Sequence, residues 1–151
     1  MAIKVSSIDE DKRVDIILRL RRYRSKVAEY QACKELYDSL FPSSVQVLSD
    51  MPMYRGDTFE PERWAIKRES QADRMRKSLD AMREAYEDTE RLTDLLEGDY
   101  RTVIVRRYQL NESWEVIAEK LHCHRATAMR WHDRAIGVLI KDATPCDIRM
   151  C

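Results

Sequence analysis

Arginine side chains near the carboxyl end of the chain are the residues best suited to binding a ligand. Arg125 and Arg130 accompany Ala126 and Met129 at spacings that place all four on one face of a helix. A guanidinium group can donate two parallel hydrogen bonds to O6 and N7 of guanine, and small or apolar neighbours let a helix lie close to the bases. Arg125 and Arg130 are therefore predicted to contact base edges in the major groove of DNA, whereas Ala126 and Met129 either touch a thymine methyl group or simply let the helix lie deep in the groove.

Further residues in the same stretch are predicted to bind phosphate groups. Lys120 and Thr127 are phosphate contacts, which position a protein on DNA without reading its sequence. Arg134 and His132 are candidates of the same kind. His124 stands where a helix cap is expected, and two explanations stay open: its ring faces a phosphate, or the helix begins elsewhere. The alternative for the arginines of this stretch is a solvated helix face.

Two short helices joined by a tight turn are predicted to position these side chains, within residues 113–139. Apolar side chains recur on both helices where the two would touch: Ile117, Ala118, Leu121, Ala128, Trp131 and Ala135. The alanines allow close approach of the two backbones. Trp114, like Trp131, is predicted to belong to this core and not to stack on bases. The pattern predicts a helix-turn-helix whose second helix enters the major groove.

The composition favours long helices over strands. Of 151 residues 36% are charged, and only three are glycine and four proline. A first helix is expected from about residue 8 to Leu40, with Ser7–Glu10 as a capping box at its start. A second is expected over about 62–97, after a loop at 42–61. Both have apolar residues at helical spacing, so they can pair antiparallel within one chain or with a second copy.

Short elements are expected to connect the second long helix to the motif. Gly98 fits the left-handed position after a helix end, and Asp99 can cap the next helix. That supporting helix is expected over 100–109. Asn111 or Ser113 then caps the first helix of the motif.

These elements predict an all-α protein with three parts. Residues 1–97 form a helical hairpin or coiled coil for oligomerisation, including the loop at 42–61. Residues 98–141 form the helix-turn-helix domain, and residues 142–151 form a tail.

Charge is distributed unevenly, although the formal net charge is zero. Residues 99–134 carry seven basic and five acidic side chains, whereas 57–97 carry eight basic and twelve acidic ones. The acidic segment is a poor match for a phosphate backbone. The basic run Lys12–Lys26 has two readings, a solvated face or a surface for flanking DNA or an acidic partner.

Cysteine usage predicts free thiols and no metal. Cys33, Cys123, Cys146 and Cys151 are expected to stay reduced in the cytosol. The run His122–His124 contains side chains that could bind zinc. However, the chain has no C-x-x-C pair, and adjacent residues on a turn point in different directions, so no metal site is expected.

No enzymatic activity, cofactor or membrane insertion is expected. The sequence has no glycine-rich phosphate loop, no HExxH motif and no nucleophile elbow. No apolar run approaches the roughly 20 residues that span a bilayer, and the first residues lack the apolar core of a signal peptide.

The carboxyl-terminal region resembles region 4 of bacterial sigma factors. The residues that carry the resemblance are Arg107-Tyr108, Ser113-Trp114-Glu115, Ile117-Ala118, Leu121 and Arg134-Ala135. The match is closer to the RinA-like and ArpU-like activators of bacteriophages and prophages, through Ser113–Ala118, Arg130–Ala135 and Ser49–Pro52. This resemblance covers about residues 40–140 and implies activation of phage late genes through promoter DNA. The chain departs from the sigma-like pattern at His124, where Ser or Thr is usual.

Three function classes follow. The first is a sequence-specific transcriptional regulator, an activator of phage or prophage late genes, with double-stranded DNA and a second copy in a homodimer as partners; contact with RNA polymerase is left open. The second is a small terminase subunit or DNA-packaging adaptor, and the third a sigma-like factor. A ring of eight or more subunits favours packaging, whereas a dimer on a two-fold symmetric site favours regulation.

Overall fold

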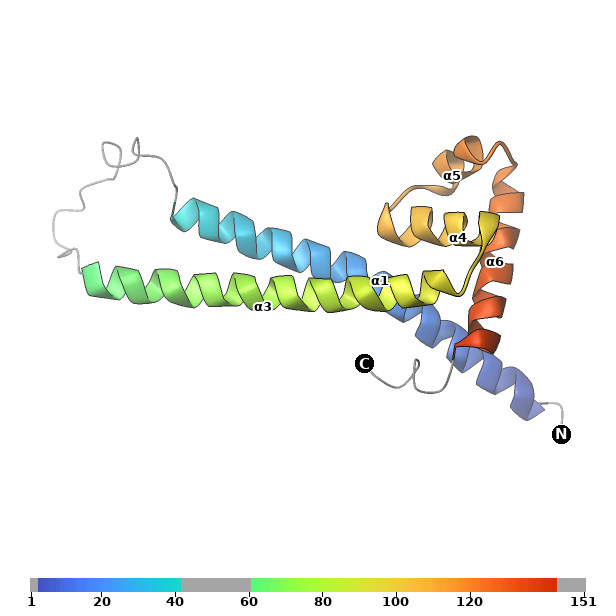
Figure 1. Ribbon diagram of the computed structural model, residues 1–151, viewed down its shortest axis with the longest axis horizontal. Helices are drawn as coiled ribbons and strands as arrows, with labels where there is room; N and C mark the ends of the chain where they lie inside the picture. Colours follow the sequence, from blue (N-terminus) through green and yellow to red (C-terminus); the bar gives the residue numbers. More distant parts are fainter. Residues whose placement is uncertain (1–2, 42–60, 144–151) are drawn as a thin grey trace. The chain divides into compact units, whose positions relative to one another are not determined.

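The computed structural model describes the backbone of residues 3–41 and 61–143 and the side chains from residue 8 onward. Two long helices come first, α1 (Ile3–Leu40) and α3 (Pro61–Asp94) (Figure 1). Four shorter elements follow: α4 (Gly98–Ile104), its continuation η1 as a wider π-type turn (Val105–Gln109), α5 (Trp114–Lys120) and α6 (Arg125–Asp142). All regular elements in the described ranges are helical, which confirms the predicted all-α class. The predicted loop at 42–61, except for its last residue, and most of the predicted tail lie outside the described residues.

The chain forms two compact units. Unit 1 comprises residues 1–25 and 83–151, and unit 2 comprises residues 26–82. Each long helix therefore contributes a segment to both units. The expected domain boundary at 97/98 falls inside unit 1, because the first part of α1 and the last part of α3 share a core with the C-terminal helices.

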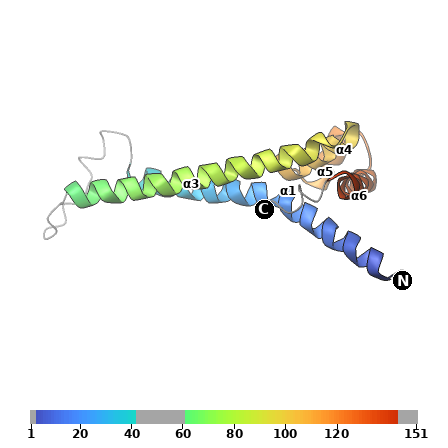
Figure 2. The same ribbon diagram turned by 60° about the horizontal axis from the view of Figure 1, so that its bottom comes forward.

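The main core of unit 1 joins four parts of the chain. Its buried members come from α1, from the end of α3 and Leu96 just beyond it, from α4 with η1, and from α6: Ile16, Leu20, Leu92, Leu96, Ile104, Tyr108, Ala135, Ile136 and Leu139. Figure 2 shows the end of α3 leading directly into α4. Ala135 belongs to this core and not to the contact between α5 and α6, so that part of the prediction was wrong.

A buried ion pair joins α1 to α3 inside unit 1. Arg19 and Asp88 are 6% and 5% exposed, and the Arg19 Nε donates to Asp88 Oδ2 over 2.9 Å. The Tyr23 and Tyr86 rings also bring α1 and α3 together, with a tilted contact and centroids 5.5 Å apart. Arg19 therefore does not belong to a solvated basic face, as one reading of the run Lys12–Lys26 proposed.

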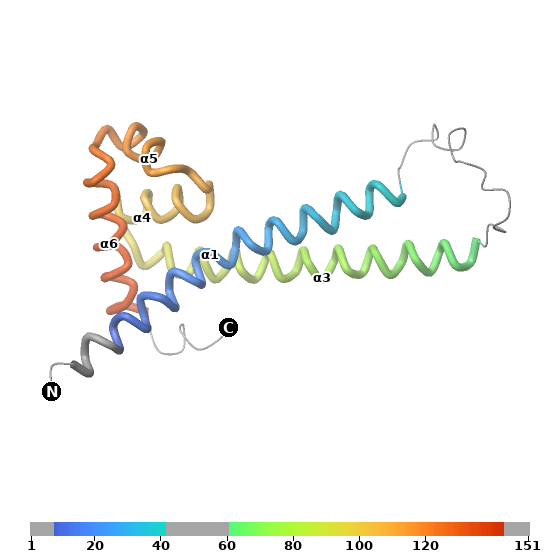
Figure 3. Tube along the Cα trace, turned by 180° about the vertical axis from the view of Figure 1, so that it is seen from behind, coloured from blue at the N-terminus to red at the C-terminus, as the bar shows by residue number. Residues whose placement is uncertain are grey.

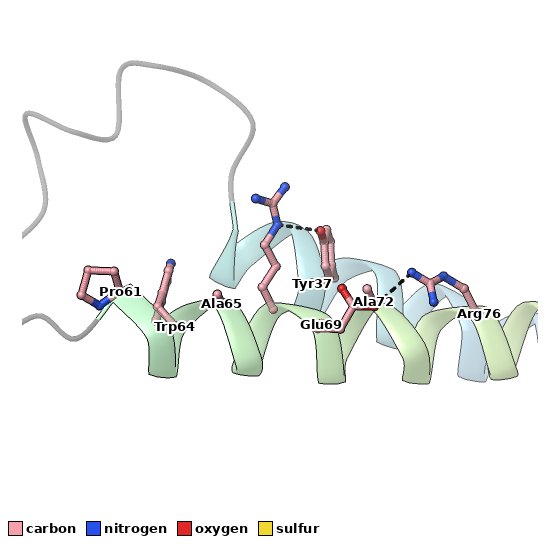
Figure 4. Close-up of a pocket in the computed structure, with 8 residues that line it drawn as sticks. Tyr37, Pro61, Trp64, Ala65, Glu69, Ala72 and Arg76 are labelled. Atoms are coloured by element: carbon pink, nitrogen blue, oxygen red, sulfur yellow. Dashed lines mark hydrogen bonds and ion pairs between the residues drawn. The ribbon is translucent and has the colours of Figure 1, made fainter.

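The described part of unit 2 contains one segment from each long helix, and these segments run antiparallel. The Phe41 and Trp64 rings lie 5.1 Å apart, and the Arg68 Nε donates to the Tyr37 hydroxyl over 3.2 Å. Figure 4 shows Tyr37 beside Glu69 and Ala72, and Trp64 nearer the start of α3; all four line the hollow between the segments. Although apolar residues line this contact, no described residue of unit 2 is buried.

Several helix ends differ from the expected positions. Because α1 begins at Ile3, the Ser7–Glu10 capping box lies within the helix and not at its start. Gly98 adopts the predicted left-handed conformation, with φ of 56°. Asp99, however, lies in the first turn of α4 and does not cap it.

Candidate nucleic-acid interface

A tight turn connects α5 to α6 (Figure 3). The Ser113 hydroxyl caps α5 by accepting a hydrogen bond from the Val116 backbone N–H over 3.4 Å. At the other end, the Cys123 N–H donates to the Ala118 carbonyl over 3.0 Å, and His122 has φ of 52°. A left-handed residue followed by the extended cap His124 redirects the chain into α6. Of the two caps that the sequence left open for α5, the structure uses Ser113.

A small apolar core holds α5 and α6 together. Val103 of α4 packs with Ile117 and Ala118 of α5 and with Ala128 of α6, and all four are buried. Half-buried side chains cover this cluster, namely Trp114, Leu121, Cys123 and Trp131. The predicted alanine contact and the core role of both tryptophans are confirmed.

The outer face of α6 carries the residues predicted to contact bases. Arg125, Ala126, Met129 and Arg130 are exposed, and Met129 retains 41% of its accessible surface. Their spacing places them on successive turns of one helix face. Figure 1 shows α6 running across α4, so α4 and α5 cover only part of its surface. The structure therefore gathers these four residues on one exposed surface, which we call the α6 face.

Two of the predicted DNA-contacting cations form ion pairs with acids. Arg125 lies 3.3 Å from the Glu115 carboxylate, and both side chains are well exposed. The Glu115 pKa is lowered, first by a hydrogen bond from its own backbone N–H and then by the Ser113 hydroxyl, with the Arg125 charge adding to both. Lys120 pairs with Glu112, and hydrogen bonds from Lys120 and Arg106 lower the Glu112 pKa. DNA would have to compete with these acids.

The other predicted contacts differ in their surroundings. Within the described residues, Arg130 and Arg134 are exposed and form no ion pair. Thr127 is half-buried. His124 is exposed and occupies the N-cap position of α6, but its side chain makes no capping hydrogen bond. The helix thus begins at the expected residue without a side-chain cap, which leaves the His124 ring at the surface.

His132 is not a phosphate contact, and this prediction was wrong. The residue is 9% exposed, and its Nε2 lies 2.8 Å from the Tyr108 hydroxyl. Nδ1 lies 3.3 Å from Asp133, and the Trp114 ring packs edge-on against the imidazole. Burial lowers the His132 pKa despite the neighbouring Asp133 carboxylate. His132 therefore helps to join η1 to α6.

Arg107 is a further cation near the motif, and its residue type and spacing alone do not predict a ligand-binding role. Its Nη1 donates to the Glu112 carbonyl over 3.0 Å, and its guanidinium carbon lies 4.9 Å from the centroid of the Trp114 ring. These contacts hold a cation beside the start of α5. The Arg-Tyr pair at the end of the supporting helix was the available signal, but only the fold shows what surrounds it.

The described residues show no metal-binding cluster and no membrane-spanning helix. In these ranges no three His, Cys, Asp or Glu side chains are grouped to hold a metal ion. Cys33 and Cys123 are free thiols, and the other two cysteines lie outside the described residues. None of the described helices combines the length and apolar character needed to cross a bilayer.

No known family model matches the chain, and neither a curated protein nor a solved structure matches it. The resemblance to phage activators and sigma region 4 therefore stays a prediction from the residues.

Proposed function

We propose that this chain is a sequence-specific DNA-binding regulator of transcription. In this proposal α4, η1, α5 and α6 form a helix-turn-helix domain of the sigma region 4 type, and α6 enters the major groove. The observation that carries the proposal is the α6 face, on which Arg125 and Arg130 flank Ala126 and Met129. The buried cluster between α4, α5 and α6 supports it, because a groove-reading helix must be held rigidly from behind.

The α6 face has the mixture of side chains that base recognition uses. The two guanidinium groups can each bridge a guanine, and the apolar side chains between them can contact a thymine methyl group. Lys120, His124, Thr127 and Arg134 provide the proposed phosphate contacts around this face. The role as an activator of phage or prophage late genes, with RNA polymerase as a further partner, rests on the resemblance alone.

Unit 2 is proposed to form a homodimer. Its two helical segments leave all their described side chains at least partly exposed, whereas helices of this length are normally stabilised by burying an apolar stripe. A dimer would place two α6 helices on two half-sites of a symmetric operator. Measurement of the mass in solution tests this, since a ring of eight or more subunits would contradict the dimer and favour the packaging class.

Selection of binding sites from random duplexes tests DNA recognition. The wild-type chain is expected to enrich a defined sequence. Arg125→Ala and Arg130→Ala are each expected to weaken binding to it by about 1–3 kcal/mol and to relax preference at one base position.

Two controls sharpen this test. Arg130→Lys keeps the charge but loses the two parallel hydrogen bonds, so it should lose selectivity more than affinity for random DNA. Arg74→Ala removes one exposed arginine of α3 and should leave the preference intact. Wild-type selectivity in both α6 alanine variants would refute the assignment of the α6 face.

A further inference from the structure

A second group of arginines surrounds a hollow between α1 and the end of η1. This hollow has a volume of about 390 Å³ and is lined by Arg21, Arg24, Ser25, Arg107 and Tyr108, all of unit 1. Three of these five residues are cationic, and no carboxylate is among them. We call this group the arginine hollow.

The arginines of α1 differ in how their charges are neutralised. Arg13 pairs with Asp133 over 2.7 Å, and Arg19 pairs with the buried Asp88. Arg21 and Arg24 are one turn apart and exposed, and within the described part of the chain neither forms an ion pair. The basic run of α1 thus has two functions: some of its arginines hold unit 1 together, and others present uncompensated charge at the hollow.

Arg107 lines the arginine hollow from η1, whereas Arg21 and Arg24 line it from α1. Its hydrogen bond to the Glu112 carbonyl and its position against the Trp114 ring hold its guanidinium in place. Like charges brought together repel one another, so an anion that enters the hollow gains attraction from all three cations. A phosphate group suits this arrangement, since guanidinium groups bind its oxygens through charge-assisted hydrogen bonds.

The place of the hollow in the fold indicates the source of that phosphate. Arg107 touches the residues that open α5, and in helix-turn-helix proteins the first helix of the motif crosses the DNA backbone. We propose that the arginine hollow binds a phosphate of the DNA backbone flanking the sequence that α6 reads. This rests on the proposed function and extends it by a sequence-independent contact made through α1.

The salt dependence of DNA binding tests this assignment. The double variant Arg21→Ala/Arg24→Ala is compared with Arg74→Ala/Lys77→Ala, which removes two exposed charges from α3 without affecting the hollow. If two phosphate contacts are lost, the slope of log Kobs against log salt should become shallower by about 2, roughly 0.9 for each contact. The preference for the selected sequence over random duplex should stay unchanged. Circular dichroism checks that both variants remain helical.

The outcomes separate this proposal from the proposed function. An unchanged slope in Arg21→Ala/Arg24→Ala, or an equal change in the α3 control, overturns the arginine hollow, while loss of selectivity in Arg130→Ala would still support the α6 face. Inorganic phosphate, followed through NMR shifts of the hollow residues, forms the second arm. If it binds the wild type and not the double variant while the DNA slope is unchanged, the hollow takes a free anion and the backbone assignment is wrong. Absence of any DNA binding by the wild type overturns both proposals.

Discussion

Unit 1 and unit 2 contain segments of the same two long helices, but all the described buried side chains lie in unit 1. In unit 1 the helices α4 to α6 cover the α1 and α3 segments, so residues such as Ile16 and Leu92 are enclosed from several sides. Among the described residues of unit 2, two helical segments touch each other, and even Trp64 at their contact stays half-buried. Two packed segments enclose a side chain from fewer sides than the four parts of the chain that meet in the core of unit 1.

This difference has a consequence for function. The α6 face is attached to the part of the molecule that has a core, so its arginines are presented from a supported helix. Unit 2 has apolar residues at helical spacing but no buried side chain in its described ranges, which fits an oligomerisation region that buries them against a second copy. Four predictions test this contrast.

Removal of the buried ion pair of unit 1 should have the largest effect. Arg19→Leu is expected to lower the free energy of unfolding by about 3–5 kcal/mol, because Asp88 would remain buried without its partner. The matched change in unit 2 is Arg76→Leu, which breaks the exposed pairs with Asp73 and Glu69 and should cost about 0–1 kcal/mol. Urea denaturation followed by circular dichroism measures both. Equal costs would mean that the two units are stabilised alike.

Truncation of a leucine side chain should likewise lower the free energy of unfolding more in unit 1 than in unit 2. Leu139→Ala leaves a cavity in the core of unit 1 and is expected to lower the free energy of unfolding by about 2–5 kcal/mol. Leu79→Ala changes a half-buried side chain of unit 2 and should cost about 1 kcal/mol, since less surface leaves water there. The same denaturation experiment compares them. A larger cost for Leu79→Ala would show that unit 2 buries this residue against a second copy.

Acidification should weaken unit 1 through His132. Because burial lowers the His132 pKa, the unfolded chain binds a proton more readily than the folded one below the ordinary histidine pKa of about 6.5. The free energy of unfolding should therefore fall as the pH drops through about 6.5 toward the His132 pKa of the folded state. Above about pH 6.5 this loss of stability should be absent. His132→Gln should reduce this dependence, although loss of the contact with Tyr108 lowers stability by about 1–3 kcal/mol at neutral pH.

His122→Gln is the matched control, because it removes an exposed histidine of the turn and leaves the contacts of His132 in place. The pKa of Asp133 is lowered overall. Its partial burial raises the pKa, but hydrogen bonds from Arg13 and His132 outweigh this effect, so Asp133 titrates in a more acidic range than His132. A profile that persists in His132→Gln would assign the acid sensitivity to another group.

The smallest effect is expected at the ion pair beside the α6 face. Glu115→Gln removes the acid that holds Arg125 and repels phosphates, so DNA affinity should rise by about twofold to fivefold with little change in stability. Titration of a labelled duplex at low salt measures this. Glu119→Gln removes an exposed acid of the same helix that forms no ion pair within the described residues, and should raise affinity less. Weaker binding by Glu115→Gln would indicate that Glu115 positions Arg125 for contact.

Local elements were predictable because their signals are local. Helical spacing placed α3, α4 with η1, α5 and α6 close to their observed ranges, and Gly98 and Ser113 marked two of the ends correctly. The start of α1 was predicted wrongly because the spacing of Ser7 and Glu10 matches a capping box. The helix in fact begins upstream, at Ile3, so these residues lie inside it. The exposed α6 face followed from the same periodicity.

The environment of single charged residues was not predictable in this way. Arg19 and Arg21 stand two positions apart in one basic run, yet Arg19 is buried against Asp88 and Arg21 lines the arginine hollow. His132 lies in the motif beside exposed residues, yet its ring is held by Tyr108.

The sequence by itself determined where the helices form, where the turn between α5 and α6 falls and which residues share the α6 face, because hydrogen bonds and spacing within a helix depend on near neighbours. Only the tertiary structure decided which arginines are buried, which are paired and which gather at the arginine hollow. These properties depend on residues distant in the chain, such as Asp88 for Arg19 and Asp133 for Arg13, and the packing of α1 and α3 against α4 to α6 brings them together.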